Sequence, residues 1–196
     1  MIIVVLRNII CIIGLVALVP LFLAVSISLI IEDGFPIFFI QKRLGVHKKI
    51  FGIFKIRTMK KNTPQLGTHD IGDEFKLNTG SVIRALKLDE FPQLANVVKG
   101  DLNLVGPRPG LVNQLELLDM RSAKDIYRIK PGITGLGQIL GYDMSDPRKL
   151  SEIDKIYLDN QSMNLNILII MGTFFGYPRN YLASKFKIAN KKKLVS

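Results

Sequence analysis

The chain has 196 residues, of which 48% are hydrophobic, and it carries 27 basic against 16 acidic side chains, a formal net charge of +11. This length favours one domain with a substantial core. One cysteine and two histidines exclude a disulfide framework and a zinc site built from Cys and His clusters, and the apolar content excludes a disordered basic tail. The charged and the hydrophobic residues must therefore occupy different parts of the molecule.

The first part of the chain is the apolar one. Residues 8–31 contain no charged side chain, and Arg7 is the only charge before Glu32. As a helix these 24 residues reach about 36 Å, which exceeds a hydrocarbon core of about 30 Å. We therefore predict a membrane anchor at residues 1–33. A cleaved signal peptide is disfavoured, because one basic residue precedes the apolar run and residues 24–26 make a poor cleavage site.

Pro20 bears on how this anchor is built. Proline removes a backbone donor and clashes with the preceding turn, so we predict a kink or break between Val16 and Pro20. A broken helix can enter and leave through the same membrane face as a re-entrant hairpin, whereas a continuous helix spans the bilayer. Lysines and arginines between residues 42 and 49 place the following residues in the cytoplasm. The residues alone leave both topologies open.

Residues 34–196 are predicted to form one cytoplasmic unit on the membrane surface. Two runs of β-branched and aromatic residues, Ile37–Gln41 and Ile50–Arg57, predict a β-hairpin. Alternation along the second strand places Lys55 and Arg57 on one face. Two cations there can bind one phosphate or simply face solvent. The polar, glycine-rich stretch from Asn62 to Gly80 predicts an irregular loop.

Helical spacing recurs in the C-terminal half, around Leu111–Leu118 and Leu150–Tyr157. Residues 165–175 are apolar but too short to span a membrane, and tyrosines and a basic tail follow them. This pattern predicts an amphipathic interfacial element attracted to anionic lipid, or a tail that only keeps the C-terminus soluble. We predict no strand before the glycines of residues 132–141, and P-loop, GxGxxG, HExxH and GxSxG motifs are absent from the sequence.

The central run contains the residue types that phosphate chemistry needs. Asp89 and Glu90 are adjacent and precede Pro92, which is tolerated in the first turn of a helix, so Asp89 is a candidate N-cap. Neighbouring carboxylates can divide the roles of nucleophile or metal ligand and of general base. Arg84 lies five residues before Asp89, and Arg108 stands between two prolines; arginine forks suit diphosphate oxygens. Carboxylates flanked by arginines fit a Mg²⁺–diphosphate site, although an acidic dipeptide by itself equally fits an ordinary helix start.

Taken in order, these segments resemble small monotopic phosphoglycosyl transferases of the bacterial sugar transferase family. The matching pieces are the anchor with Pro20, residues 54–59 (FKIRTM), Arg84 with residues 88–94 (LDEFPQL), residues 96–109 (NVVKGDLNLVGPRP) and residues 130–138 (KPGITGLGQ). Two departures stand out, since Val19 precedes Pro20 where the family often has serine, and Leu-Gly-Gln at 136–138 replaces the usual Trp-Ala-Gln. The resemblance implies an α+β fold, mostly helical, with a β-hairpin, a re-entrant membrane helix broken at Pro20 and amphipathic interfacial helices.

The resemblance also implies an activity. Members of the family transfer a sugar 1-phosphate from a UDP-sugar to polyprenyl (undecaprenyl) phosphate and release UMP, at the cytoplasmic face of the bacterial inner membrane. This reaction initiates O-antigen, capsule or other surface-glycan assembly. Asp89 matches the nucleophile, which forms a covalent phosphosugar intermediate and contacts Mg²⁺, and Glu90 matches the acid that assists the acceptor phosphate. Lys55, Arg84 and Arg108 match the family's substrate-binding cations. Arg57 is added only because alternation along the strand places it on the same face as Lys55.

The expected partners are therefore a UDP-sugar, polyprenyl phosphate and membrane lipid, with a homodimer or downstream glycosyltransferases as further partners and no nucleic acid. The length is that of a minimal catalytic unit without the extra membrane helices of larger relatives. Two other classes stay open. A membrane-tethered nucleic-acid-binding module would use the +10 charge of residues 32–196, yet no motif of such a module is recognisable. A non-catalytic assembly factor of the same fold is the second.

Overall fold

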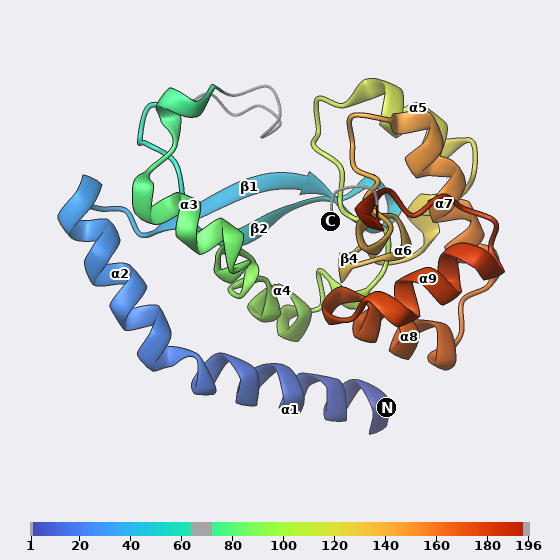
Figure 1. Cartoon of the computed structure of the whole chain (residues 1–196), viewed down its shortest axis with the longest axis horizontal. Helices are drawn as coiled ribbons and strands as arrows, with labels where there is room; N and C mark the ends of the chain where they lie inside the picture. Colours follow the sequence, from blue (N-terminus) through green and yellow to red (C-terminus); the bar gives the residue numbers. More distant parts are fainter. Residues whose placement is uncertain (1, 64–71, 194–196) are drawn as a thin grey trace. The chain divides into compact units, whose positions relative to one another are not determined.

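The computed structural model describes residues 2–63 and 72–193, which form an α+β structure dominated by helices (Figure 1). The chain divides into two compact units. The first comprises residues 1–42 and 52–101, and the second comprises residues 43–51 and 102–196. The predicted α+β class, with mostly helical content, is confirmed.

The predicted hairpin is present. It consists of β1 (Phe38–Leu44) and β2 (Ile50–Ile56), which pair directly with each other. β1 continues beyond the predicted end at Gln41. A short 3₁₀ turn at Val46–Lys48 connects the strands, and the Gly45 amide donates to the Lys49 carbonyl at 2.8 Å. The tip of the hairpin belongs to the second unit and its open end to the first.

The apolar N-terminal segment forms two helices, α1 (Ile2–Ala17) and α2 (Val19–Asp33). They meet at an angle of 51°, and Pro20 is the second residue of α2, where a missing backbone donor costs little. The predicted break is confirmed. Within residues 2–63 and 72–193, no single helix is long and apolar enough to cross a membrane, and only this bent pair passes that test jointly.

Helices α1 and α2 pack on the other helices of the first unit, since α1 lies along α4 (Gln93–Lys99) and α2 lies along α3 (Asn78–Ala85). The core here contains Leu29, Ile56, Leu77 and Ile83, all less than 5% exposed. Leu29 comes from α2 and Ile56 from β2. The apolar segment therefore contributes to the core of this unit as well as presenting an exposed apolar surface.

Helix α3 corrects the prediction of an irregular loop between Asn62 and Gly80. Residues 64–71 of that stretch lie outside the described residues, but a 3₁₀ turn at Asp73–Phe75 and the start of α3 at Asn78 fall within it. The amides of Asn78 and Thr79 donate to the Glu32 carboxylate at 2.7 and 3.0 Å. Hydrogen bonds from Thr79 and Asn78 lower the pKa of Glu32. The cap comes from a residue 46 positions earlier, so local sequence cannot reveal it.

The second unit contains a pair of short parallel strands, β3 (Asn103–Val105) and β4 (Gly132–Thr134), with Asn103 opposite Gly132. β4 lies within the glycine-rich segment, where the sequence shows no clear strand signal. Three residues are too few for a pattern to emerge. The strands also depend on close backbone contact, because a Cβ at Gly132 would lie 2.1 Å from the Gly106 nitrogen.

Helices surround this strand pair (Figure 1). Their bounds are α5 (Leu115–Ser122), α6 (Leu136–Ile139), α7 (Pro147–Asp159), α8 (Met163–Phe174) and α9 (Gly176–Lys185). The predicted helical spacing at Leu150–Tyr157 is confirmed in α7, which buries Leu150, Ile153 and Tyr157. The first predicted helix begins at Leu115 instead of Leu111, because Leu111 forms a β-bridge with Arg43.

Helices α8 and α9 carry both a buried and an exposed apolar surface. Leu165, Ile169 and Leu182 are buried in the core of the second unit. In contrast, Phe174 is 75% exposed and Tyr177 is 83% exposed. An exposed apolar surface beside basic residues is typical of an interfacial element, and the membrane-surface role of this segment stays a prediction.

Candidate active site

Asp89 and Glu90 lie in a 3₁₀ turn, Leu88–Glu90, between α3 and α4. Lys87, directly before it, has a left-handed backbone with φ 56°, and the Phe91 amide donates to the Leu88 carbonyl at 3.3 Å. The predicted N-cap position of Asp89 is wrong, because Pro92 is the residue that precedes α4. Both carboxylates are half-buried and therefore remain partly accessible.

Four charged side chains act on one another here. Burial raises the pKa of Asp89, the neighbouring Glu90 raises it further, and Lys55 and Arg84 act in the opposite direction. The pKa of Asp89 is therefore set by opposing effects, with burial and the like charge outweighing the two cations. The structure thus brings together four of the predicted site residues: Asp89, Glu90, Lys55 and Arg84.

Lys55 is positioned through its neighbours on β2. Asn96, from α4, is fully buried, and its side-chain amide donates to the Gly52 carbonyl at 2.8 Å. Its Oδ1 accepts a hydrogen bond from the Phe54 amide at 3.0 Å. One side chain therefore fixes the backbone of β2 on both sides of Ile53, adjacent to Lys55. The sequence analysis missed Asn96, since an asparagine within a helix has no local signature of a long-range backbone contact.

Arg84 comes from the last turn of α3. Its Nε donates to the Thr58 hydroxyl at 2.7 Å, and Thr58 is 5% exposed. Close packing holds these elements together, because a Cβ at Gly80 would lie 2.1 Å from the Thr58 carbonyl oxygen. Thr58 is thus a second positioning residue that the sequence analysis missed, and it orients the Arg84 guanidinium.

Arg57 has a different environment. It is 6% exposed, and its guanidinium forms an ion pair with Asp33 at the end of α2. It also donates to the Gly34 carbonyl at 2.5 Å. β2 ends at Ile56, so the alternation that predicted a shared face for Lys55 and Arg57 does not extend to Arg57. In this structure Arg57 joins the end of the anchor to the hairpin.

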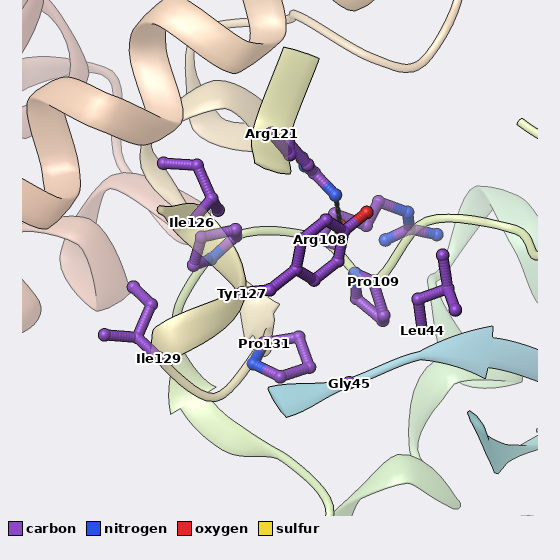
Figure 2. Close-up of a pocket in the computed structure, with 10 residues that line it drawn as sticks. Leu44, Gly45, Arg108, Pro109, Arg121, Ile126, Tyr127, Ile129 and Pro131 are labelled. Carbon is purple, nitrogen blue, oxygen red and sulfur yellow. Dashed lines mark hydrogen bonds between the residues drawn. The ribbon is translucent and has the colours of Figure 1, made fainter. Parts of the chain in front are cut away.

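Arg108 belongs to the second unit, where it lines a cavity of about 10 Å³, room for one water at most. Two buried arginines hold its loop by the backbone: Arg121 donates to the Arg108 carbonyl at 2.8 Å, and Arg43 donates to the Pro109 carbonyl at 3.0 Å. Figure 2 shows Arg121 reaching from α5 toward Arg108. Arg121 is itself fixed by Asp154 of α7, with nitrogen–oxygen distances of 2.9 and 2.5 Å.

Comparison with known proteins identifies the family. The bacterial sugar transferase family matches residues 2–179 of the chain. The chain belongs to this family. The match covers α1 and α2, the hairpin and the Asp89–Glu90 turn, and the resemblance predicted from the motifs is confirmed.

Several curated proteins are similar to this bacterial sugar transferase. EpsL of Bacillus subtilis (strain 168), an uncharacterized sugar transferase, is 44% identical over 141 residues, 71% of this chain and 69% of that protein. The exopolysaccharide production protein ExoY of Sinorhizobium fredii is 36% identical over 183 residues, 84% of this chain and 80% of that protein. The UDP-N-acetylgalactosamine-undecaprenyl-phosphate N-acetylgalactosaminephosphotransferase of Aeromonas hydrophila is 38% identical over 161 residues, 79% of this chain but only 38% of that protein.

Proposed function

We propose that this sugar transferase moves a sugar 1-phosphate from a UDP-sugar to polyprenyl phosphate, releases UMP, and thereby initiates the assembly of a surface glycan. The name of the Aeromonas relative describes such a transfer to undecaprenyl phosphate. The observation that carries the proposal is the environment of Asp89, a half-buried carboxylate beside a second acid and two cations. This environment suits a nucleophile that attacks an anionic phosphorus centre, because the cations offset the repulsion between carboxylate and phosphate.

In the first step, an Asp89 carboxylate oxygen attacks the phosphorus that bears the sugar. The bond to the bridging oxygen of the diphosphate breaks, and UMP leaves with that electron pair. The product is a sugar phosphoryl group joined to Asp89 through a mixed anhydride. Because the charges of Lys55 and Arg84 act on Asp89, we assign to them the stabilisation of negative charge on the transferred group and the leaving group.

In the second step, a phosphate oxygen of the lipid acceptor attacks the same phosphorus. The bond between Asp89 and phosphorus breaks, which restores the carboxylate and leaves the sugar on a lipid diphosphate. Glu90 is adjacent to the reacting centre, and we assign to it the removal of a proton from the acceptor phosphate when that phosphate is monoprotonated. The two acids then have separate tasks.

The donor set also fits Mg²⁺. Among residues 2–63 and 72–193, no three His, Cys, Asp or Glu side chains gather into a preformed metal site. Mg²⁺ commonly binds through one or two carboxylates together with substrate phosphates and water, and Asp89 and Glu90 supply that number. In our proposal Asp89 contacts the ion, which when bound neutralises charge on the diphosphate oxygens.

The N-terminal helices support a membrane location. Most of their exposed side chains are apolar, and the 51° break at Pro20 allows the segment to enter and leave on one side. We propose the re-entrant arrangement at the inner membrane with the site on the cytoplasmic face. This arrangement holds the Asp89 turn, which shares a unit with the anchor, near the level of a lipid phosphate.

A UMP-release screen tests the proposal. The full chain is incubated with Mg²⁺, undecaprenyl phosphate and each of a set of UDP-sugars, and UMP and lipid-linked sugar are measured together. We expect at least one UDP-sugar to give UMP and lipid-linked sugar in equal amounts. Release of UDP in place of UMP would indicate a glycosyl transfer that leaves the phosphate behind and would contradict the proposal.

A further inference from the structure

The first unit contains an apolar cavity of about 550 Å³. It lies between the break of the anchor, the hairpin and the segment that follows Glu90. All ten residues that line it are apolar, among them Leu18, Phe22, Phe38, Phe54 and Phe91. Its size falls within the range of small-molecule sites, and a wall of this composition favours a hydrocarbon ligand.

The cavity is accessible from outside the protein. Val19, Phe38, Ile40 and Phe91 line it and are 47, 49, 56 and 36% exposed. Exposed apolar side chains around a hollow indicate a surface that a ligand covers. The rings of Phe22 and Phe38 stack with a centroid separation of 5.2 Å and give one wall a fixed shape.

The break at Pro20 creates this hollow. Leu18 and Val19, which line it, lie at the junction of α1 and α2. A straight helix would carry α2 away from the hairpin, whereas the 51° bend brings Phe22 of α2 against Phe38 of β1. The bend therefore allows a re-entrant topology and also forms an apolar cavity within the unit that carries Asp89.

The cavity adjoins the candidate active site at two points along the chain. Phe91 and Pro92 line it and directly follow Glu90. Phe54 lines it and directly precedes Lys55. Phe54 and Lys55 point to opposite faces of β2, so the closer junction is after Glu90, where the backbone of the charged turn continues directly into the apolar wall at Phe91. An amphiphile fits this arrangement, with its phosphate head at the charged residues and its hydrocarbon tail in the apolar cavity.

We infer that the cavity holds the isoprene units nearest the phosphate of the polyprenyl acceptor, an inference that rests on the proposed function. The phosphate is directed toward Lys55 and Arg84 and the chain toward the break at Leu18 and Val19. A cavity of about 550 Å³ accommodates the start of a long polyprenyl chain and leaves the remainder in the bilayer. A wide cavity walled by aromatic rings suits a methyl-branched isoprenoid better than a slender acyl chain, because it leaves less unfilled space.

A chain-length experiment tests this site. The full protein in detergent micelles is assayed with undecaprenyl phosphate and with a two-isoprene phosphate, geranyl phosphate, and kcat/KM is measured for each acceptor. Ala95 lines the cavity and Ala95→Phe fills it. Ala24 is exposed on α2 and is not among the lining residues, so Ala24→Phe adds the same ring elsewhere in the unit.

We expect Ala95→Phe to lower kcat/KM by about tenfold or more with both acceptors, because the two isoprene units of geranyl phosphate are the units nearest its phosphate and small changes in an apolar pocket alter kcat/KM by roughly 10- to 200-fold. Ala24→Phe should leave both values within about twofold of wild type. Unchanged kcat/KM in Ala95→Phe, or an equal loss in Ala24→Phe, would show that the cavity does not bind the chain.

A second measurement covers the case in which Ala95→Phe fails to fold. A farnesyl phosphate that carries a diazirine is photolysed with the wild-type protein, and the labelled peptides are mapped. We expect labels on the peptides that contain Phe38 and Phe91, and competition by undecaprenyl phosphate. Labelling elsewhere, or equal competition by phosphatidylglycerol, would overturn the inference. Because this label reports binding without turnover, wild-type protein that labels as expected but releases no UMP would refute the proposed function alone.

Discussion

The two units each contain an aspartate near an arginine, and the two sites are built in opposite ways. Asp154, in the second unit, is 3% exposed and accepts hydrogen bonds from Arg121 at 2.9 and 2.5 Å. Asp89, in the first unit, is half-buried beside Glu90, and the Nε of Arg84 is engaged by Thr58. Arg84 and Lys55 influence Asp89 through their charge.

The environments of Asp154 and Asp89 distinguish a structural ion pair from a reactive carboxylate. A carboxylate that is saturated by a buried arginine holds two helices and a loop in place, as Asp154 does through Arg121. Burial raises the pKa of both Asp154 and Asp89, so the pKa alone does not separate them. Asp89 is half-buried whereas Asp154 is buried, and a carboxylate that remains partly exposed can form a new bond. The pair of Arg57 and Asp33 belongs to the first kind, since Arg57 is buried and also binds the Gly34 carbonyl.

Removing the carboxylate charge of Asp154 should have the largest effect on stability. Asp154→Asn leaves the buried Arg121 without a counter-charge, and we expect the free energy of unfolding to fall by about 3–5 kcal/mol. The matched control is Asp159→Asn on the same helix, which breaks an exposed pair with Lys155 and should cost less than about 1 kcal/mol. Urea denaturation measures both, and equal losses would place Asp154 in the same class as a surface pair.

The pair of Arg57 and Asp33 should give a smaller loss. Arg57→Met removes an ion pair and a hydrogen bond to a backbone carbonyl, and we expect a cost of about 1–3 kcal/mol. A double-mutant cycle with Asp33→Asn should give a coupling of similar size, and KM for the UDP-sugar should rise less than in Arg84→Met. A large rise in KM without loss of stability would instead assign Arg57 to substrate binding, as the alternation along the strand had predicted.

Replacing a cation near Asp89 should change the pH dependence of the first-step rate. Lys55 and Arg84 oppose the rise in the pKa of Asp89, so Lys55→Met or Arg84→Met should raise that pKa further. A larger fraction of Asp89 is then protonated at a given pH, and the acidic limb of the first-step rate should move to higher pH. Lys99→Met, at the exposed C-terminal end of α4, should leave the limb in place. A shift to lower pH in either test variant would contradict this electrostatic account.

Asp89 itself should destabilise the folded protein at neutral pH, which is the smallest effect. Its pKa is raised in the folded state by burial and by Glu90, so folding favours the protonated form and the ionised form carries a penalty. Asp89→Asn removes that penalty, and its free energy of unfolding at pH 7 should exceed that of wild type. The difference in free energy of unfolding between the variant and wild type should disappear as the pH falls toward the ordinary carboxyl range near 4. A less stable Asn variant at pH 7 would show that Asp89 is a structural residue like Asp154.

The sequence predicted those features that depend on local chemistry. The break at Pro20 follows from the missing backbone donor, the hairpin from its two β-branched runs, and α7 from its apolar spacing. The site residues Asp89, Glu90, Lys55 and Arg84 were also found from motifs, and the structure brings these four together.

The features that the sequence did not predict depend on contacts between distant residues. Helix α3 begins at Asn78 because Glu32 accepts its first amide hydrogens. β4 exists because Gly132 allows close contact with Gly106. The role of Arg57 is set by Asp33, and that of Asn96 by the backbone of β2. In each case the partner is remote in sequence, so neither propensity nor periodicity carries the information.

The most direct test of the central claim is intact-protein mass spectrometry of wild type and Asp89→Asn after incubation with a UDP-sugar and Mg²⁺ in the absence of lipid acceptor. We predict that wild type gains the mass of one sugar phosphate, that peptide mapping assigns this mass to Asp89, and that added undecaprenyl phosphate removes it. Asp89→Asn should fold and gain no mass. An adduct of the same mass on Asp89→Asn, or on another residue of wild type, would contradict the assignment of Asp89 as the nucleophile.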